Sequence, residues 1–136
     1  MFKQNKSFAY FIGFLIFIDL CSAVCELKWV KTDHKIIPAN SVLGNTGNGL
    51  GDFYPSRAVH NGVLTPGRFK PAEERCFITM DGKEFAIATD FEVLTNPNHC
   101  ILEWKAARDG TLPNGAVEAG VDKQGVSHLS KQLLKF

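Results

Sequence analysis

The hydrophobic positions along the chain fall into short runs that are separated by turn residues, a pattern typical of an all-β protein. Asn61-Gly62 and Asp81-Gly82 each separate two such runs, and these dipeptides are the strongest short signals for a β-hairpin. We therefore expect antiparallel hairpins at both places. The expected strands cover residues 27–30, 57–60, 63–64, 77–80, 84–88, 91–94 and 101–104.

Other segments predict turns, a loop and one helix. Thr65-Pro66-Gly67 has the composition of a type II turn, with proline setting φ and glycine in the left-handed position. The glycine- and asparagine-rich residues 45–51 predict a loop. At the end of the chain, Leu129 and Leu133 are four residues apart, so residues 127–136 predict a helix.

The N-terminal residues have the features of a secretory signal peptide. Lys3 and Lys6 precede an apolar and aromatic run over residues 8–18, and Cys21-Ser22-Ala23 supplies the small residues that a signal peptidase reads. The run is shorter than the roughly 20 residues that span a bilayer, so no membrane insertion is expected. We expect a signal peptide at 1–23, cleavage after Ala23, and a secreted, extracellular protein.

Composition limits the remaining possibilities. A chain of 136 residues predicts one domain, here residues 24–136. The formal net charge is +1, and removal of residues 1–23 leaves equal numbers of basic and acidic side chains, so no nucleic-acid partner is expected. Cys25, Cys76 and Cys100 remain after cleavage. In a secreted protein they allow one disulfide and one leftover thiol, and the sequence does not choose the pair.

The chain matches itself at an offset of 75 residues, which indicates an internal repeat. The first repeat covers about 25–94 and a partial second repeat about 100–136, because a complete second copy would extend beyond Phe136. We therefore expect a pseudo-twofold arrangement of short strands with a truncated second repeat. The matched positions are Cys25, Leu27, Trp29, Pro38 and Val42 with Cys100, Leu102, Trp104, Pro113 and Val117.

Several motifs follow one another in a fixed order along nearly all of the mature chain. They are residues 56–58 (SRA), 62–68 (GVLTPGR), 82–84 (GKE), 91–94 (FEVL), Trp104 and 110–117 (GTLPNGAV). This series resembles the DM-nine repeat family, also called natterin N-terminal-like. The resemblance implies an all-β, pseudo-twofold domain of the lectin type, which binds mannose-type sugars and recognises microbial surfaces. No cofactor is expected.

The resemblance also implies a sugar site, made by an aspartate of the glycine-rich loop and a basic residue after the Thr-Pro-Gly turn. Arg68 stands at the basic position, where lysine is usual, and Gly47 stands at the aspartate position of the first repeat. Asp122 matches that aspartate in the second repeat, and Asn45 or Asn48 is a neutral substitute in the first. The expected carbohydrate-binding residues are thus Arg68, Asp122 and Asn48, with Asp122 meeting an arginine only if repeats exchange edges.

Structural roles are expected for other prominent residues. Trp29 and Trp104 occupy equivalent repeat positions, so packing in the core or between repeats is favoured over sugar stacking. Arg57 is expected to pair with a nearby acid. Lys83 and Glu84 follow a hairpin turn and are interpreted as structural.

The sequence holds no known catalytic signature. The four histidines have no metal-ligand spacing with one another or with cysteine, so no metal site is expected. A pair of His60 with Cys76 or Cys100 stays open, but no flanking motif supports a nucleophile there. We do not expect an enzyme.

Two functions follow from these observations. The first is a secreted protein that recognises mannose-type glycans on microbial or cell surfaces, with a role in innate immunity. The alternative is a truncated interaction protein without a sugar site, which binds a partner such as a second copy of itself through exposed strand edges.

Overall fold

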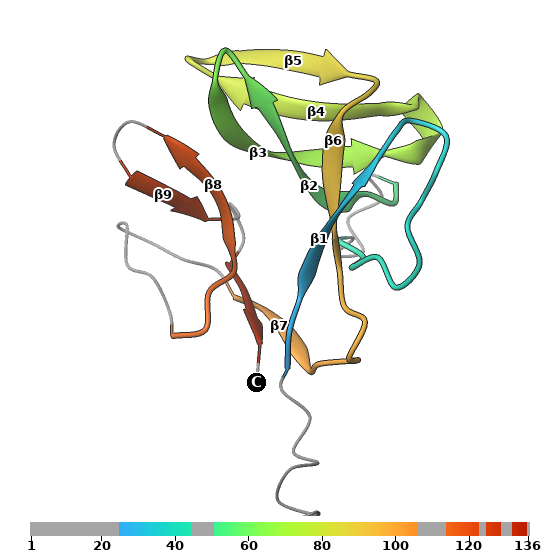
Figure 1. The fold of residues 1–136 in the computed structure, drawn as a ribbon, viewed down its shortest axis with the longest axis vertical. Coiled ribbons are helices and arrows are strands. Elements are labelled where there is room, and N and C mark those ends of the chain that lie inside the picture. Colours follow the sequence, from blue (N-terminus) through green and yellow to red (C-terminus); the bar gives the residue numbers. More distant parts are fainter. Residues whose placement is uncertain (1–24, 45–50, 106–113, 123–124, 129–131, 136) are drawn as a thin grey trace, which may run out of the picture.

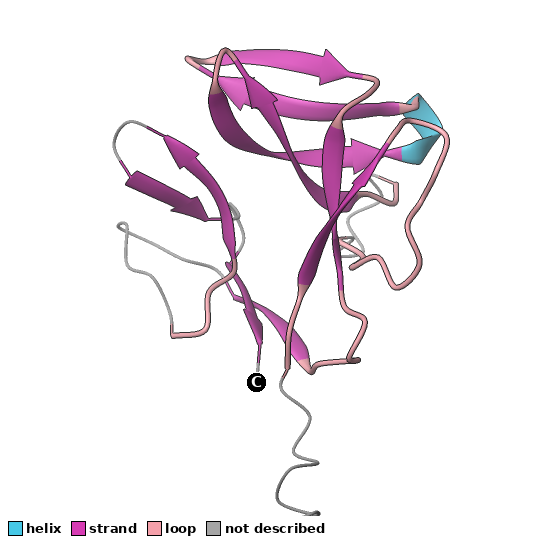
Figure 2. Cartoon of the chain, viewed as in Figure 1, coloured by secondary structure: helices cyan, strands magenta, loops and turns pink. Residues whose placement is uncertain are grey.

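The computed structural model describes residues 25–44, 51–105, 114–122, 125–128 and 132–135. These residues form ten strands and one short 3-10 helix, η1 (Pro71–Glu73), so the predicted all-β class is confirmed (Figure 2). The strands are β1 (Lys28–Thr32), β2 (Tyr54–His60), β3 (Val63–Lys70), β4 (Arg75–Met80), β5 (Lys83–Ile87), β6 (Phe91–Thr95), β7 (Leu102–Lys105), β8 (Glu118–Asp122), β9 (Gly125–His128) and β10 (Gln132–Lys135).

Most of the strands form one antiparallel sheet with the order β1-β6-β2-β3-β4-β5 (Figure 1). β8 joins this sheet at β3 through the pair Leu64 and Val121, and β9 continues from β8 as a hairpin. β7 and β10 form a separate two-stranded sheet. In Figure 1, β5 and β7 lie at opposite ends of the molecule.

Two hairpin turns lie where the sequence predicts them. Asn61 and Gly62 link β2 to β3 with φ values of 49° and 77°. Asp81 and Gly82 link β4 to β5 with φ values of 52° and 74°. Positive φ at both central residues is the requirement of a type I′ turn, and asparagine, aspartate and glycine adopt it at the lowest cost. Both hairpin predictions are confirmed.

The predicted type II turn at Thr65-Pro66-Gly67 is wrong. All three residues lie inside β3, and Gly67 pairs with Ser56 of β2 and Ile78 of β4. The glycine is needed for a different reason, because a Cβ at position 67 would collide with the carbonyl oxygen of Phe77. It therefore lets two backbones approach closely, which is the other common use of glycine in a strand.

The predicted helix over residues 127–136 is also wrong. Its described residues end β9 and form β10, which pairs with β7 so that Leu133 lies opposite Trp104. Two leucines four residues apart cannot distinguish a helix from a strand in so short a segment, and pairing with β7 decides the outcome.

One hydrophobic cluster fills the inner face of the main sheet. Its members alternate along β2, β3, β4 and β6, so their side chains share one face. Cys76 belongs to this cluster, and its sulfur lies 3.0 Å from the hydroxyl of the buried Ser56. The buried members are Ala58, Phe69, Cys76, Ile78, Phe91 and Val93.

A second cluster joins the first part of the chain to β7 and β8, and we call it the joining cluster. Its buried members are Val42, Leu94 and Ala119. Three pairs that the 75-residue offset matches belong to it, namely Leu27 with Leu102, Trp29 with Trp104 and Val42 with Val117. Both tryptophans thus have the packing role that the sequence predicts. The repeat boundaries themselves stay a prediction.

The disulfide connects Cys25 to Cys100, and Cys76 is the free thiol of the described residues. The bonded cysteines are 75 residues apart, the same offset as the matched pairs, and lie just ahead of β1 and β7. The bond therefore fastens together the starts of the two strands that carry Trp29 and Trp104.

Candidate functional site

Arg68 lies on the outer face of the main sheet. Its neighbour Phe69 is fully buried on the inner face, so Arg68 points to the opposite side because strand residues alternate. The guanidinium donates from Nη2 to Glu84 Oε2 over 2.6 Å, and the two side chains are 45% and 47% exposed. The pair therefore offers solvent both a strong donor and a strong acceptor.

An aromatic ring lies beside this ion pair. Phe77 of β4 is the register partner of Arg68, whose guanidinium carbon is 5.9 Å from the ring centroid. Lys70, two residues along β3, places its ammonium 5.6 Å from the same centroid and pairs with Glu73 at 2.7 Å. We call the surface formed by Arg68, Lys70, Phe77 and Glu84 the Arg68 face.

The structure places the predicted residue Asp122 away from Arg68. Asp122 ends β8, next to Val121, whose partner on β3 is Leu64. Arg68 is four residues further along β3 than Leu64, which separates their Cα atoms by roughly 13 Å at about 3.3 Å per residue. The third predicted residue, Asn48, and the neighbouring Gly47 lie outside the described residues.

Glu84 and Phe77 are the residues that sequence reasoning missed. The sequence predicts only a structural role for Glu84 behind a hairpin turn, whereas the structure makes it the carboxylate partner of Arg68. The signal that could have found it is register: the Asp81-Gly82 turn fixes Thr79 opposite Glu84 and Phe77 opposite Ala86. When β3 pairs with β4 so that Arg68 lies opposite Phe77, the long Arg68 side chain reaches diagonally across β4 to Glu84.

Arg57 has the structural role expected of it. Its guanidinium pairs with Glu92 of β6, and both side chains are mostly buried, at 21% and 33% exposed. The same guanidinium lies 4.5 Å from the centroid of the Trp29 ring. Arg57 thus ties β2 to β1 and β6 and is separate from the Arg68 face.

The described cysteines offer no thiolate near neutral pH. Cys100 is held in the disulfide. Burial raises the pKa of the Cys76 thiol to about 11, and the contact with the Ser56 hydroxyl only partly opposes this effect. His60, the proposed partner base, packs its ring against Phe85 at 4.2 Å. The Cys–His nucleophile considered from the sequence therefore has no activated sulfur.

Among the described residues, no group of three or more His, Cys, Asp or Glu side chains is placed to hold a metal ion. Nor does any helix there have the length and apolar character needed to cross a membrane.

Comparison with protein families shows the family to which the chain belongs. The DM9 repeat matches residues 48–127, more than half of the sequence. The chain belongs to the DM9 repeat family. The matched region of this DM9 protein includes all of β2 to β8 and the whole Arg68 face. The family is known as a lectin-like carbohydrate-binding domain, which fits a recognition role. Comparison with curated proteins finds no match.

Proposed function

We propose that this DM9 protein is a secreted lectin that recognises mannose-type glycans on microbial or cell surfaces through the Arg68 face. The observation that carries the proposal is the exposed ion pair of Arg68 and Glu84 beside the Phe77 ring. Membership of the DM9 repeat family supports the sugar class in general.

The chemistry of the pair suits vicinal hydroxyl groups. A guanidinium has five N–H donors, and the contact with Glu84 Oε2 uses one nitrogen, so other donors stay available. The carboxylate of Glu84 accepts hydrogen bonds from sugar hydroxyls, while Arg68 donates to their oxygens. The ring of Phe77 lies within reach of an apolar sugar face.

Glu84 provides a carboxylate that this chain lacks at the loop position of the family pattern. Gly47 occupies the loop position where the resemblance places a carboxylate, so that position has no acceptor side chain. Glu84 supplies a carboxylate to the same arginine from β5. Because the site is open to water, single-site affinity is expected to be weak, and display of several copies would raise it.

Retention on mannan beads tests the proposal. We expect the wild-type protein to be retained and to be released by free mannose. Arg68→Ala and Glu84→Gln should each reduce retention at least tenfold, because they remove the donor and the charged acceptor. Lys31→Ala is the matched control. Lys31 of β1 forms a similar exposed ion pair, with its Nζ 3.1 Å from Asp90 Oδ1.

Each other outcome has a clear meaning. Retention that Arg68→Ala leaves unchanged would remove the Arg68 face from the sugar site. Failure of the folded wild-type protein to bind mannan would contradict the proposed function and favour the alternative, a protein partner on the outer strands β1 and β5 of the sheet.

A further inference from the structure

A second concave site lies apart from the Arg68 face. It is an open pocket of about 380 Å³ where the segment before β2, the turn after β6 and β7 meet. None of its lining residues belongs to β2, β3, β4 or β5. The residues that matter for its chemistry are Asn40, Ser41, Asn96, His99, Leu102 and Trp104, and we call it the Trp104 pocket.

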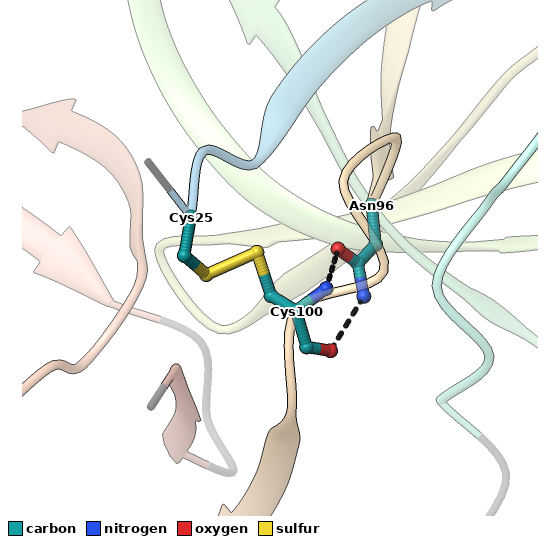
Figure 3. The surroundings of a disulfide bond; sticks show 3 residues. All are labelled: Cys25, Asn96 and Cys100. Carbon is teal, nitrogen blue, oxygen red and sulfur yellow. Dashed lines mark hydrogen bonds between the residues drawn. A yellow bond between two sulfur atoms is a disulfide. The ribbon is translucent and has the colours of Figure 1, made fainter. Parts of the chain in front are cut away.

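The wall that carries His99 is fixed in place. Asn96 donates from Nδ2 to the carbonyl of Cys100 at 2.9 Å, and its Oδ1 accepts from the Cys100 N–H at 2.8 Å (Figure 3). Cys100 is in turn held by the disulfide to Cys25. The Asn96 N–H also donates to the Asn40 carbonyl at 2.8 Å, which links the two walls. A pocket held in this way needs little ordering when it binds.

Several polar groups of the pocket have no hydrogen-bond partner within the part of the chain that the structure describes. Among the described residues, the Asn40 amide, the His99 ring and the Trp104 indole N–H make no hydrogen bond. The Ser41 hydroxyl donates to the Pro38 carbonyl at 2.6 Å and keeps its acceptor lone pairs. Free donors and acceptors beside an aromatic ring and an aliphatic side chain are a combination found in small-ligand sites.

The lining also indicates the class of ligand. It combines the aromatic Trp104 and the apolar Leu102 with amide, hydroxyl and imidazole groups, and the described residues of the lining include no Asp, Glu, Lys or Arg. A small uncharged molecule with both hydroxyl groups and an apolar face fits this chemistry. A pyranose ring has these properties, and the volume is at the small end of ligand pockets.

We propose that the Trp104 pocket is a second sugar site, which takes one uncharged pyranose ring independently of the Arg68 face. The choice of a sugar rests on the proposed function. Trp104 is only partly buried in the joining cluster, so the part of its ring that lines the pocket provides the stacking surface. Asn40, Ser41 and His99 bind the hydroxyls. Asn40 and His99 hold left-handed backbone with φ of 59° and 51°, and such residues often gather at ligand sites.

The two tryptophans make a direct test available. Their indole N–H groups give two signals in a 1H–15N NMR spectrum, assigned with a Trp104→Phe variant. On titration with methyl α-D-mannopyranoside we expect the Trp104 signal to shift. The Trp29 signal should stay in place, because its ring lies against the Arg57 guanidinium. Arg68→Ala should leave the Trp104 shift unchanged.

A side-chain deletion adds the second readout. Asn40→Gly removes the amide while glycine accepts the φ of 59°, so the fold and the Asn40 carbonyl contact persist. We expect it to weaken the binding seen at Trp104 at least fivefold.

The outcomes separate the two proposals. Mannan retention with an unmoved Trp104 signal would overturn the second site and leave the Arg68 site standing. A Trp104 shift that disappears in Arg68→Ala would show one site only, and would also overturn it. The absence of both mannan retention and a shift would overturn the second site together with the proposed function.

Discussion

The sheet has no room for a side chain at position 67, where β3 and β4 lie close together. A Cβ built at this position would meet the Phe77 carbonyl oxygen and would lie 2.7 Å from Ile78 Cγ2. We expect Gly67→Ala to lower the free energy of unfolding by about 1–3 kcal/mol, because β3 and β4 would have to separate. Urea unfolding measures this loss.

Gly62→Asn is the control for that variant. Nothing lies within 4 Å of a Cβ at position 62, and asparagine tolerates the φ of 77°. Equal stability of Gly67→Ala and the wild-type protein would refute the close approach of the two backbones.

Because of Cys76, the free energy of unfolding is expected to fall at alkaline pH. The pKa of its thiol is about 11 in the folded protein and 9.0 without burial, so the unfolded chain releases this proton first. The folded state is therefore favoured below pH 9, and this contribution disappears as the pH rises through 11, a loss of about 3 kcal/mol.

Comparison with Cys76→Ala between pH 8 and pH 11 isolates that contribution, because the two proteins differ in this side chain alone. We expect a steeper fall of unfolding free energy in the wild-type protein. Parallel pH profiles of the two proteins would contradict the buried, protonated thiol.

At the scale of elements, the sequence predicts hairpins better than anything else. Asn61-Gly62 and Asp81-Gly82 determine their turns locally, since their residues adopt positive φ cheaply and leave little choice of register. The seven expected strands all overlap observed ones, although β2 and β3 extend well beyond the predicted ranges.

The errors arise where distant contacts decide the structure. Pro66 and Gly67 carry a turn signal, yet pairing with β2 and β4 keeps them in β3. Leu133 carries a helix signal, yet pairing with β7 makes it part of β10. In each case the local pattern is ambiguous and the partner strand lies elsewhere in the sequence.

The disulfide makes its own prediction at this scale. Cys25 and Cys100 close a loop across a separation of 75 residues, for which chain entropy gives a stabilisation of about 4 kcal/mol. The double variant Cys25→Ser, Cys100→Ser should have an unfolding free energy lower by that amount, and therefore a lower urea midpoint. An unchanged urea midpoint would show that the bond does not constrain the unfolded chain.

At the scale of the whole molecule, the joining cluster packs the segments up to β6 against β7 and β8. Leu94 is fully buried there, between segments that carry Trp29 and Trp104. Leu94→Ala should cost about 2–5 kcal/mol in unfolding free energy. Val59→Ala is the control, because Val59 is 64% exposed and its loss should change stability by less than about 0.5 kcal/mol.

The sequence predicts only part of the candidate sites. Arg68 follows from the family motif, but its carboxylate comes from Glu84, sixteen residues later on another strand. The Trp104 pocket gathers Asn40, His99 and Trp104 from three segments. Neither arrangement has a local spacing rule, because strand register and the disulfide bring these residues together.

Calorimetric titration of the folded protein with a soluble mannose disaccharide tests the central claim, sugar recognition through the Arg68 face, most directly. The account predicts saturable binding by the wild-type protein and by Lys31→Ala, and at least tenfold weaker binding by Arg68→Ala. Dilution heat alone from the wild-type protein, or equal affinity in all three proteins, would contradict it.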